Sequence, residues 1–191
     1  MKKYFKVSLI LGLITLICAA LIALMNMATS KVIENNEKKV IEETYTSIFS
    51  DYSYNEKREY KDNSGYIKAK VEAFDKDGKS LGFIYTLEGK NSYGGISLMV
   101  GINNLEVIDV EFLSNTESFA STVNSHVKEN YPSKEEKIIE ITPYGKSSKN
   151  DVDSLTEEEI DNIDTSCGAT FGATLVKNLI AAALAEAKEA A

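Results

Sequence analysis

Residues 66–74 read YIKAKVEAF and alternate between apolar and polar side chains. This period of two residues is typical of a half-buried β-strand. A turn sequence, DKDG at Asp75–Gly78, leads into the apolar stretch LGFIYTL at residues 81–87. Two strands joined by a short turn rich in Asp and Gly predict a β-hairpin. This hairpin decides the fold class, because it makes the start of the sheet antiparallel.

After this hairpin the sequence continues in short strands and then ends in a helix. Strands flanked by helices and joined by hairpins predict an α+β fold with a largely antiparallel sheet. The last segment is alanine-rich and lacks proline, which favours a helix. The predicted elements are strands at 95–102, 105–113 and 137–141, a helix at 117–129 with Phe119, Val123 and Val127 on its apolar face, a polar surface loop at 145–166 with a helical turn at 155–160, and a helix at 169–190.

The N-terminal part is of a different kind, since residues 7–27 contain no charged side chain. As a helix these 21 residues would extend about 30 Å, enough to cross the core of a bilayer. The sequence therefore predicts one transmembrane helix. A cleaved signal peptide is the alternative, although its apolar region usually runs about 7–15 residues. A lipid anchor at Cys18 is disfavoured by the bulky Ile17 before it.

Charge is distributed unevenly along the sequence, and this predicts the orientation in the membrane. The net charge is −8, but residues 1–30 carry +3 from Lys2, Lys3 and Lys6, which leaves −11 for the rest. The positive-inside rule places the lysine-rich end in the cytoplasm and the body outside it. An acidic body also argues against nucleic acid as a partner. The predicted organisation is a cytoplasmic tail at 1–6, a transmembrane anchor at 7–27, a stalk helix at 28–50 and an extracytoplasmic domain at 51–191.

The residues best suited to a binding site lie in the segment DTSCGAT, which runs from Asp164 to Thr170 at the start of the last predicted helix. A loop of small residues there presents a threonine hydroxyl at a helix N-terminus. Such an end offers unpaired backbone N–H groups and the positive end of the helix dipole, both suited to phosphate. Gly168 lets the backbone approach a ligand closely. From these residues alone, simple capping of the helix remains the alternative.

The longer pattern Asp-x-x-(Ser/Thr)-Gly-Ala-Thr resembles the flavinylation motif of the FMN-binding domain family. That family includes the G subunit of Rnf electron-transport complexes and the C subunit of sodium-pumping NADH:quinone oxidoreductases. The resemblance implies that Thr170 carries FMN through a phosphoester, attached by a separate flavin transferase that recognises Asp164. Cys167 stands where the family has Ser or Thr. A second Gly-Ala-Thr ends at Thr174 but has Gly168, not an acid, six residues before it.

Two further stretches carry the resemblance. The segment from Ser92 to Ile102 is similar to the family's Gly-Tyr-x-Gly-x-Ile strand opening. The segment from Leu113 to Ser118, which contains Glu117, matches the position of its Glu-Thr-Pro-Gly segment, whose proline and glycine are here Phe119 and Ala120. Alternatively, Tyr93 only opens a strand and Glu117 is an acid in the first turn of a helix, favoured by its dipole. The resemblance implies a flavin site made of Tyr93, Gly94, Gly95, Glu117, Ser118, Cys167, Gly168, Ala169 and Thr170.

The resemblance implies an electron-transfer subunit with covalent FMN, working with other membrane subunits in an ion-translocating complex of the Rnf type. Such a subunit is a redox carrier and needs no catalytic acid or base of its own. Because His126 is the single histidine, the sequence offers no histidine-based metal cluster or catalytic triad. Two alternatives remain open. One is a membrane-tethered, non-redox interaction module, and the other is a stand-alone extracytoplasmic flavin reductase.

Overall fold

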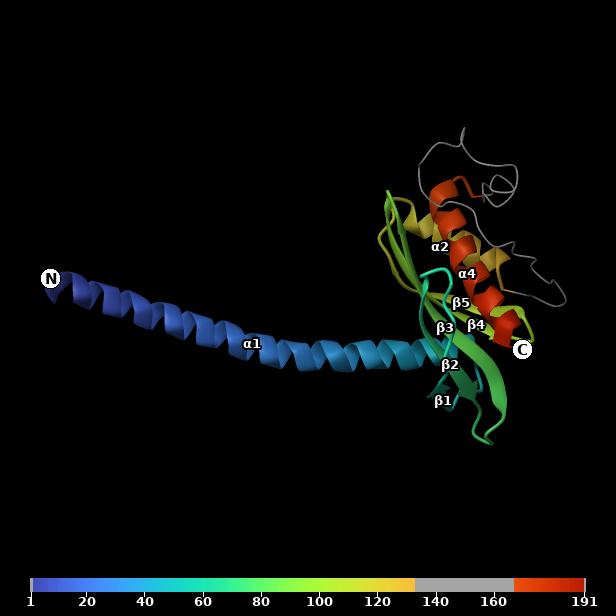
Figure 1. Cartoon of the computed structure of the whole chain (residues 1–191), viewed down its shortest axis with the longest axis horizontal. Helices are drawn as coiled ribbons and strands as arrows, with labels where there is room; N and C mark the ends of the chain where they lie inside the picture. The colour runs from blue at the N-terminus through green and yellow to red at the C-terminus, as the bar shows by residue number, and fades with distance from the viewer. Residues whose placement is uncertain (1, 133–166, 191) are drawn as a thin grey trace. The chain divides into compact units, whose positions relative to one another are not determined.

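The computed structural model describes residues 2–132 and 167–190, and Figure 1 shows the protein. The predictions for residues 137–141, 145–166 and Asp164 therefore lie outside the described residues. The protein forms two compact units, Met1–Glu43 and Thr44–Ala191. The candidate site belongs to the second unit. The predicted domain boundaries at residues 27 and 50 remain predictions.

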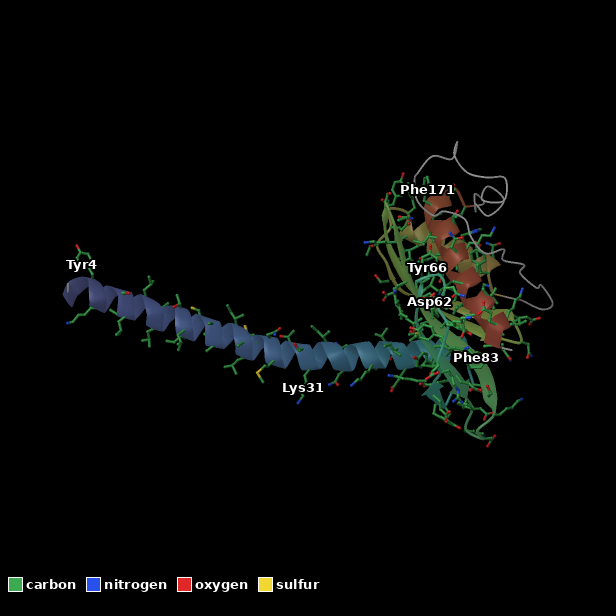
Figure 2. All side chains as sticks on the ribbon, viewed as in Figure 1. Tyr4, Lys31, Asp62, Tyr66, Phe83 and Phe171 are labelled. Atoms are coloured by element: carbon green, nitrogen blue, oxygen red, sulfur yellow. The ribbon has the colours of Figure 1, made fainter. Side chains whose placement is uncertain are left out.

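The first helix, α1, runs without a break from Lys2 to Ile48. It takes in both the predicted transmembrane span and the predicted helical stalk. The apolar stretch of α1 is buried nowhere in the structure, and its side chains project all round the ribbon in Figure 2. By length and composition, this is the one helix among the described residues that could cross a membrane. Its last turn, from Thr44 onward, belongs to the second unit.

The second unit is built on a five-stranded antiparallel sheet in which each strand pairs with the next in sequence. The α+β class and the antiparallel sheet are thus confirmed. The sequence does not predict the first strand, because its residues YNEK have no apolar face and their side chains stay largely exposed at the sheet edge. The strands are β1 (Tyr54–Lys57), β2 (Ile67–Phe74), β3 (Ser80–Asn91), β4 (Gly94–Asn103) and β5 (Glu106–Asn115).

Two helices, α2 (Ala120–Asn130) and α4 (Thr170–Ala190), cover one face of this sheet. Their apolar residues join alternate residues of β3 and β4, together with Val107 and Val110 of β5, in one core, and Figure 1 shows both helices against the strands. Gly89 lets α4 pack closely, because a Cβ there would lie 2.8 Å from Leu175 and 3.1 Å from Leu179. The most buried members of this core include Leu87, Leu98, Val100, Val123, Val127, Leu175, Leu179 and Ile180.

The start of α2 differs from the prediction. The helix begins at Ala120 rather than at residue 117, and Phe119 precedes it in a non-helical conformation. Phe119 is 62% exposed, whereas Val123 and Val127 are fully buried. Phe119 therefore does not belong to the apolar face of the helix, although its spacing matches that face.

The opposite face of the sheet is covered in part by the end of α1. Val100 and Ile102 of β4 point into the core under α2 and α4, so Gly101 between them faces the other way. There a Cβ at Gly101 would overlap the side chain of Ile48 and would lie 3.4 Å from the ring of Phe49. Glycine at this position therefore allows the last turn of α1 to rest directly on the strand.

Candidate functional site

The N-terminal end of α4 presents Thr170 as its first residue. The backbone N–H of Ala173 donates to the carbonyl oxygen of Ala169 at 3.0 Å, which closes the first turn. Gly168 has a φ of +73°, in the left-handed region that only glycine adopts readily. The half-buried Thr170 side chain thus lies at the positive end of the dipole of a 21-residue helix.

A pocket of about 230 Å³ adjoins this helix end. It is formed by three segments that are far apart in the sequence: the turn between β3 and β4, the segment between β5 and α2, and the start of α4. Five of the residues predicted from the resemblance line it. The lining residues are Tyr93, Glu117, Phe119, Gly168, Ala169, Thr170, Phe171 and Gly172.

Glu117 is the one charged residue among those that line the pocket, and it is buried, with 9% exposure. The side-chain amide of Asn91 donates a hydrogen bond to its Oε1. A Cβ at Gly172 would lie 2.5 Å from its Oε2, so glycine in the first turn of α4 makes room for the carboxyl group. Burial raises the pKa of Glu117 above its ordinary value, while the hydrogen bond from Asn91 offsets part of that rise.

The position of Glu117 corrects one alternative from the sequence. As an acid in the first turn of its own helix, it would lie within α2. Instead it precedes α2, with its carbonyl oxygen accepting from the N–H of Ala120 at 3.2 Å. Its side chain meets the first turn of α4 at Gly172.

The two glycines that open β4 hold the Glu117 segment in place without lining the pocket. A Cβ at Gly94 would lie 2.6 Å from the carbonyl oxygen of Thr116 and 2.7 Å from the backbone nitrogen of Glu117. The N–H of Gly95 donates to Thr116 Oγ1 at 2.8 Å, and the N–H of Thr116 donates to the carbonyl of Gly95 at 2.9 Å. The opening of β4 therefore fixes the backbone just before the pocket.

The remaining predicted residues lie close to the pocket or outside the described residues. Ser118 is exposed and does not line the pocket, and Cys167 is half-buried against the core under the helices. Asp164 lies outside the described residues. Thr174, the end of the second Gly-Ala-Thr, is 2% exposed and buried in α4, whereas Thr170 faces the pocket.

Four contributors to the site are not predicted as site residues from the sequence: Asn91, Phe119, Phe171 and Gly172. Asn91 holds the Glu117 carboxyl, and its side-chain oxygen also accepts from the N–H of Tyr93 at 2.8 Å. An asparagine just before Tyr-Gly-Gly is a turn signal that could have indicated this role. The contributions of Phe171 and Gly172 depend on the packing of α4 against the Glu117 segment, which no local pattern encodes.

A larger depression of about 600 Å³ lies on the opposite face of the same end of the sheet. Its lining includes Lys68 of β2, Glu88 and Lys90 of β3 and Ser97 of β4. The residues next to them, Ile67, Leu87, Ile96 and Leu98, belong to the core under the helices. Of the predicted site residues it contains only Gly95. The smaller pocket is therefore the better candidate, because Thr170 and Glu117 meet there.

Comparison with known proteins bears on the N-terminal helix. The matching segment is residues 1–48, which is α1 with Met1. It matches the RnfG N-terminal region. The RnfG match ends at the last residue of α1, so it includes none of the residues that line the pocket. A search of curated proteins finds no match to this sequence.

Proposed function

We propose that this protein carries FMN as a phosphoester on Thr170 and transfers electrons as a membrane-anchored subunit of an Rnf-type complex. The observation that carries the proposal is the pocket itself. Thr170, Glu117 and Tyr93 come from three separate segments, and the resemblance to the FMN-binding domain family points to all three from sequence alone. The RnfG match of residues 1–48 supports the same assignment independently.

The residues around Thr170 fit a tethered phosphate. The first amides of a helix have no partner within the helix, and the helix dipole favours a negative group beside them. Gly168 and Ala169 add no bulk at this point. Glu117 would oppose a phosphate when ionised, and burial raises the pKa of this carboxyl above its ordinary value, while the hydrogen bond from Asn91 offsets part of that rise. The backbone donors at the start of α4 therefore suit a phosphoester.

The size of the pocket supports a carrier rather than an enclosed active site. At about 230 Å³ it is smaller than ligand pockets that enclose their ligand, which measure roughly 300–1,000 Å³. Part of the FMN would then extend beyond the protein, within reach of an electron donor or acceptor. The flavin would supply the redox chemistry, while the protein binds and orients it.

The proposal also covers location and partners. α1 would anchor the protein in the cell membrane as a single span, with the N-terminus in the cytoplasm and the second unit outside. The partners would be the other membrane subunits of an ion-translocating complex and, during maturation, a flavin transferase that recognises residues 164–170. A covalent bond has a physical advantage in this location, because FMN that dissociated outside the cell would be lost.

Flavin fluorescence after denaturing electrophoresis tests the covalent bond. The full-length protein is co-expressed with a flavin transferase, and the gel is viewed under light that excites flavin. We expect a fluorescent band for the wild type and none for Thr170→Val. The matched control is Thr174→Val, which changes the neighbouring Gly-Ala-Thr and should leave the band unchanged. Intact mass should show one FMN on the wild type.

Two outcomes would contradict the proposal in different ways. A dark wild-type band would exclude a covalent flavin and favour the non-redox interaction module. A band lost in Thr174→Val and kept in Thr170→Val would retain the flavin but move the attachment site. Co-purification with other membrane subunits separates a carrier in a complex from a stand-alone reductase.

A further inference from the structure

Three aromatic side chains from three different segments line the pocket beside Thr170. Tyr93 comes from the turn between β3 and β4, Phe119 from the segment before α2, and Phe171 from the first turn of α4, where Figure 2 labels it. Tyr93 and Phe171 stack on each other, with ring centroids 5.2 Å apart and an angle of 29° between the planes. This stack fixes the plane of the Tyr93 ring at the pocket.

Phe119 is unusually exposed for a residue of its kind. At 62% it is the most exposed large apolar side chain in the described part of the second unit, ahead of Tyr54 at 43% and Leu105 at 39%. An exposed phenyl ring gains free energy when another apolar surface covers it. Since Phe119 stands where the FMN-binding domain family has proline, the resemblance does not account for it.

The occupant that these rings suit is planar and aromatic. Aromatic rings favour offset stacks with centroids about 4.5–7 Å apart, and each such pair adds stabilisation beyond burial alone. Tyr93 is 37% exposed, so part of its ring is accessible from the pocket although its stack with Phe171 is in place. Both exposed rings share the pocket with Thr170, the proposed point of attachment.

We propose that Tyr93 and Phe119 hold the isoalloxazine ring of the flavin carried by Thr170. This inference rests on the proposed function and assigns the ring-binding residues within it. Phe171 supports Tyr93 from the side of α4, and Phe119 closes the pocket from the segment before α2. The two residues therefore determine whether the flavin ring is docked on the protein or moves freely on its tether.

Flavin emission reports this docking, because an excited flavin accepts an electron from a phenol ring in contact with it and loses its fluorescence. A phenylalanine ring is a much poorer electron donor. The full-length protein, loaded by co-expression with a flavin transferase, is measured in detergent before and after unfolding in guanidinium. The native emission per flavin, divided by the emission of the unfolded protein, gives the extent of quenching.

We expect strong quenching in the wild type and a rise of native emission in two variants. Tyr93→Phe retains an aromatic ring beside Phe171 but removes the phenol, so we expect a change in quenching with the ring stack kept. Phe119→Ala should lower the ratio of docked to undocked ring by about two- to tenfold, the effect of losing one aromatic pair. Phe119→Tyr adds a second phenol and should quench further.

Tyr54→Phe is the matched control, because Tyr54 stacks on Phe74 at 5.0 Å outside the pocket. It should leave the emission ratio unchanged. If the emission ratio of the flavin-loaded protein is the same in the wild type, Tyr93→Phe and Phe119→Ala, the ring assignment is wrong. The proposed tether at Thr170 would still stand. Unfolded wild type without flavin emission would overturn both proposals.

Discussion

At the scale of single residues, Glu117 shows how much of the structure is needed to place one side chain. Gly94 leaves room for its backbone, Gly172 leaves room for its carboxyl group, and Asn91 donates to that carboxyl. Asn91 and Gly94 flank the turn between β3 and β4, whereas Gly172 lies far along the sequence in α4. The consequence is a buried acid at a helix N-terminus, where its charge state can be tested by pH.

Glu117→Gln should make the folded protein more stable at neutral pH than the wild type. Burial raises the pKa of Glu117 in the folded state, so in the wild type the folded state binds more protons than the unfolded state above the ordinary carboxyl pKa. The free energy of unfolding of the wild type therefore falls as pH rises from the ordinary carboxyl pKa through the raised pKa of the folded state. The advantage of the variant should disappear below about pH 4, where both states hold the proton. Thermal unfolding in detergent, followed by tyrosine fluorescence, measures this difference.

Asp62→Asn is the control, because we expect it to change stability at neutral pH in the opposite direction. Burial tends to raise the pKa of Asp62, but hydrogen bonds from Ser64, Gly65 and Ile67 outweigh it, and the pKa is lowered. Ionised Asp62 thus stabilises the fold at neutral pH, and this contribution is lost as pH falls through its folded pKa. Asp62→Asn should therefore destabilise the protein at neutral pH. A Glu117→Gln variant that behaves like Asp62→Asn would show that Glu117 is held as the anion.

At the scale of elements, a buried ion pair joins β2 to the C-terminal part of α4. Lys70 Nζ lies 2.7 Å from Glu186 Oε2, and the Tyr85 hydroxyl donates to the same oxygen at 2.6 Å. Both charged side chains are at most 5% exposed, and the Lys70 ammonium lies 4.5 Å from the centre of the Phe83 ring. Since α4 also carries Thr170, this pair helps fix the helix that presents the pocket.

Lys70→Met should lower the free energy of unfolding by about 3–5 kcal/mol, because it leaves the Glu186 carboxylate buried without its counter-charge. Replacing Glu186 as well, in Lys70→Met/Glu186→Leu, should recover most of that loss. The unpaired Tyr85 hydroxyl would still cost about 1–3 kcal/mol. Urea unfolding of the full-length protein in detergent measures the wild type and both variants.

The exposed pair Lys128–Glu111, at 2.8 Å, is the matched control. With the Lys128 side chain 48% exposed, Lys128→Met should cost no more than about 1 kcal/mol. Equal losses in Lys70→Met and Lys128→Met would contradict a buried role for the first pair.

The elements differ in how far the sequence predicts them. It predicts β2 to β5 because alternating apolar residues reveal a strand with one buried face. β1 has no such face, and the polar end of β3, Glu88–Asn91, is paired with β4 all the same. The predicted start of α2 is wrong because spacing alone assigns Phe119 to the apolar face. Glu117 and Thr170 line the same pocket because α4 packs beside the segment before α2, and only the family resemblance indicates this arrangement from the sequence.

At the scale of the whole molecule, the proposed function draws on different observations in the two units. The RnfG match lies on α1, whereas the pocket lies in the second unit. Three lysines precede the uncharged span, while Lys31 is the single basic residue within six residues after it. Basic residues close to a span favour the cytoplasmic side. The charge pattern therefore predicts the orientation that the proposed extracytoplasmic flavin requires.

C-terminal fusions test this orientation in a bacterial cell. Alkaline phosphatase folds to its active form outside the cytoplasm, and green fluorescent protein exported by the general secretory pathway fluoresces only inside it. We expect an active phosphatase fusion and a dark fluorescent-protein fusion for the wild type. Replacing Lys2, Lys3 and Lys6 together by Gln removes the basic residues before the span, so phosphatase activity should fall and fluorescence should appear.

Lys38→Gln/Lys39→Gln is the control for this experiment, because these lysines lie more than ten residues beyond the span and should have little influence on its orientation. An inactive wild-type phosphatase fusion with a fluorescent counterpart would place the second unit in the cytoplasm. The flavin on Thr170 would then face the cytoplasm, where lost FMN can be replaced, and the advantage argued for a covalent bond would no longer apply. An orientation unchanged in the triple lysine variant would instead assign control of topology to the folded second unit.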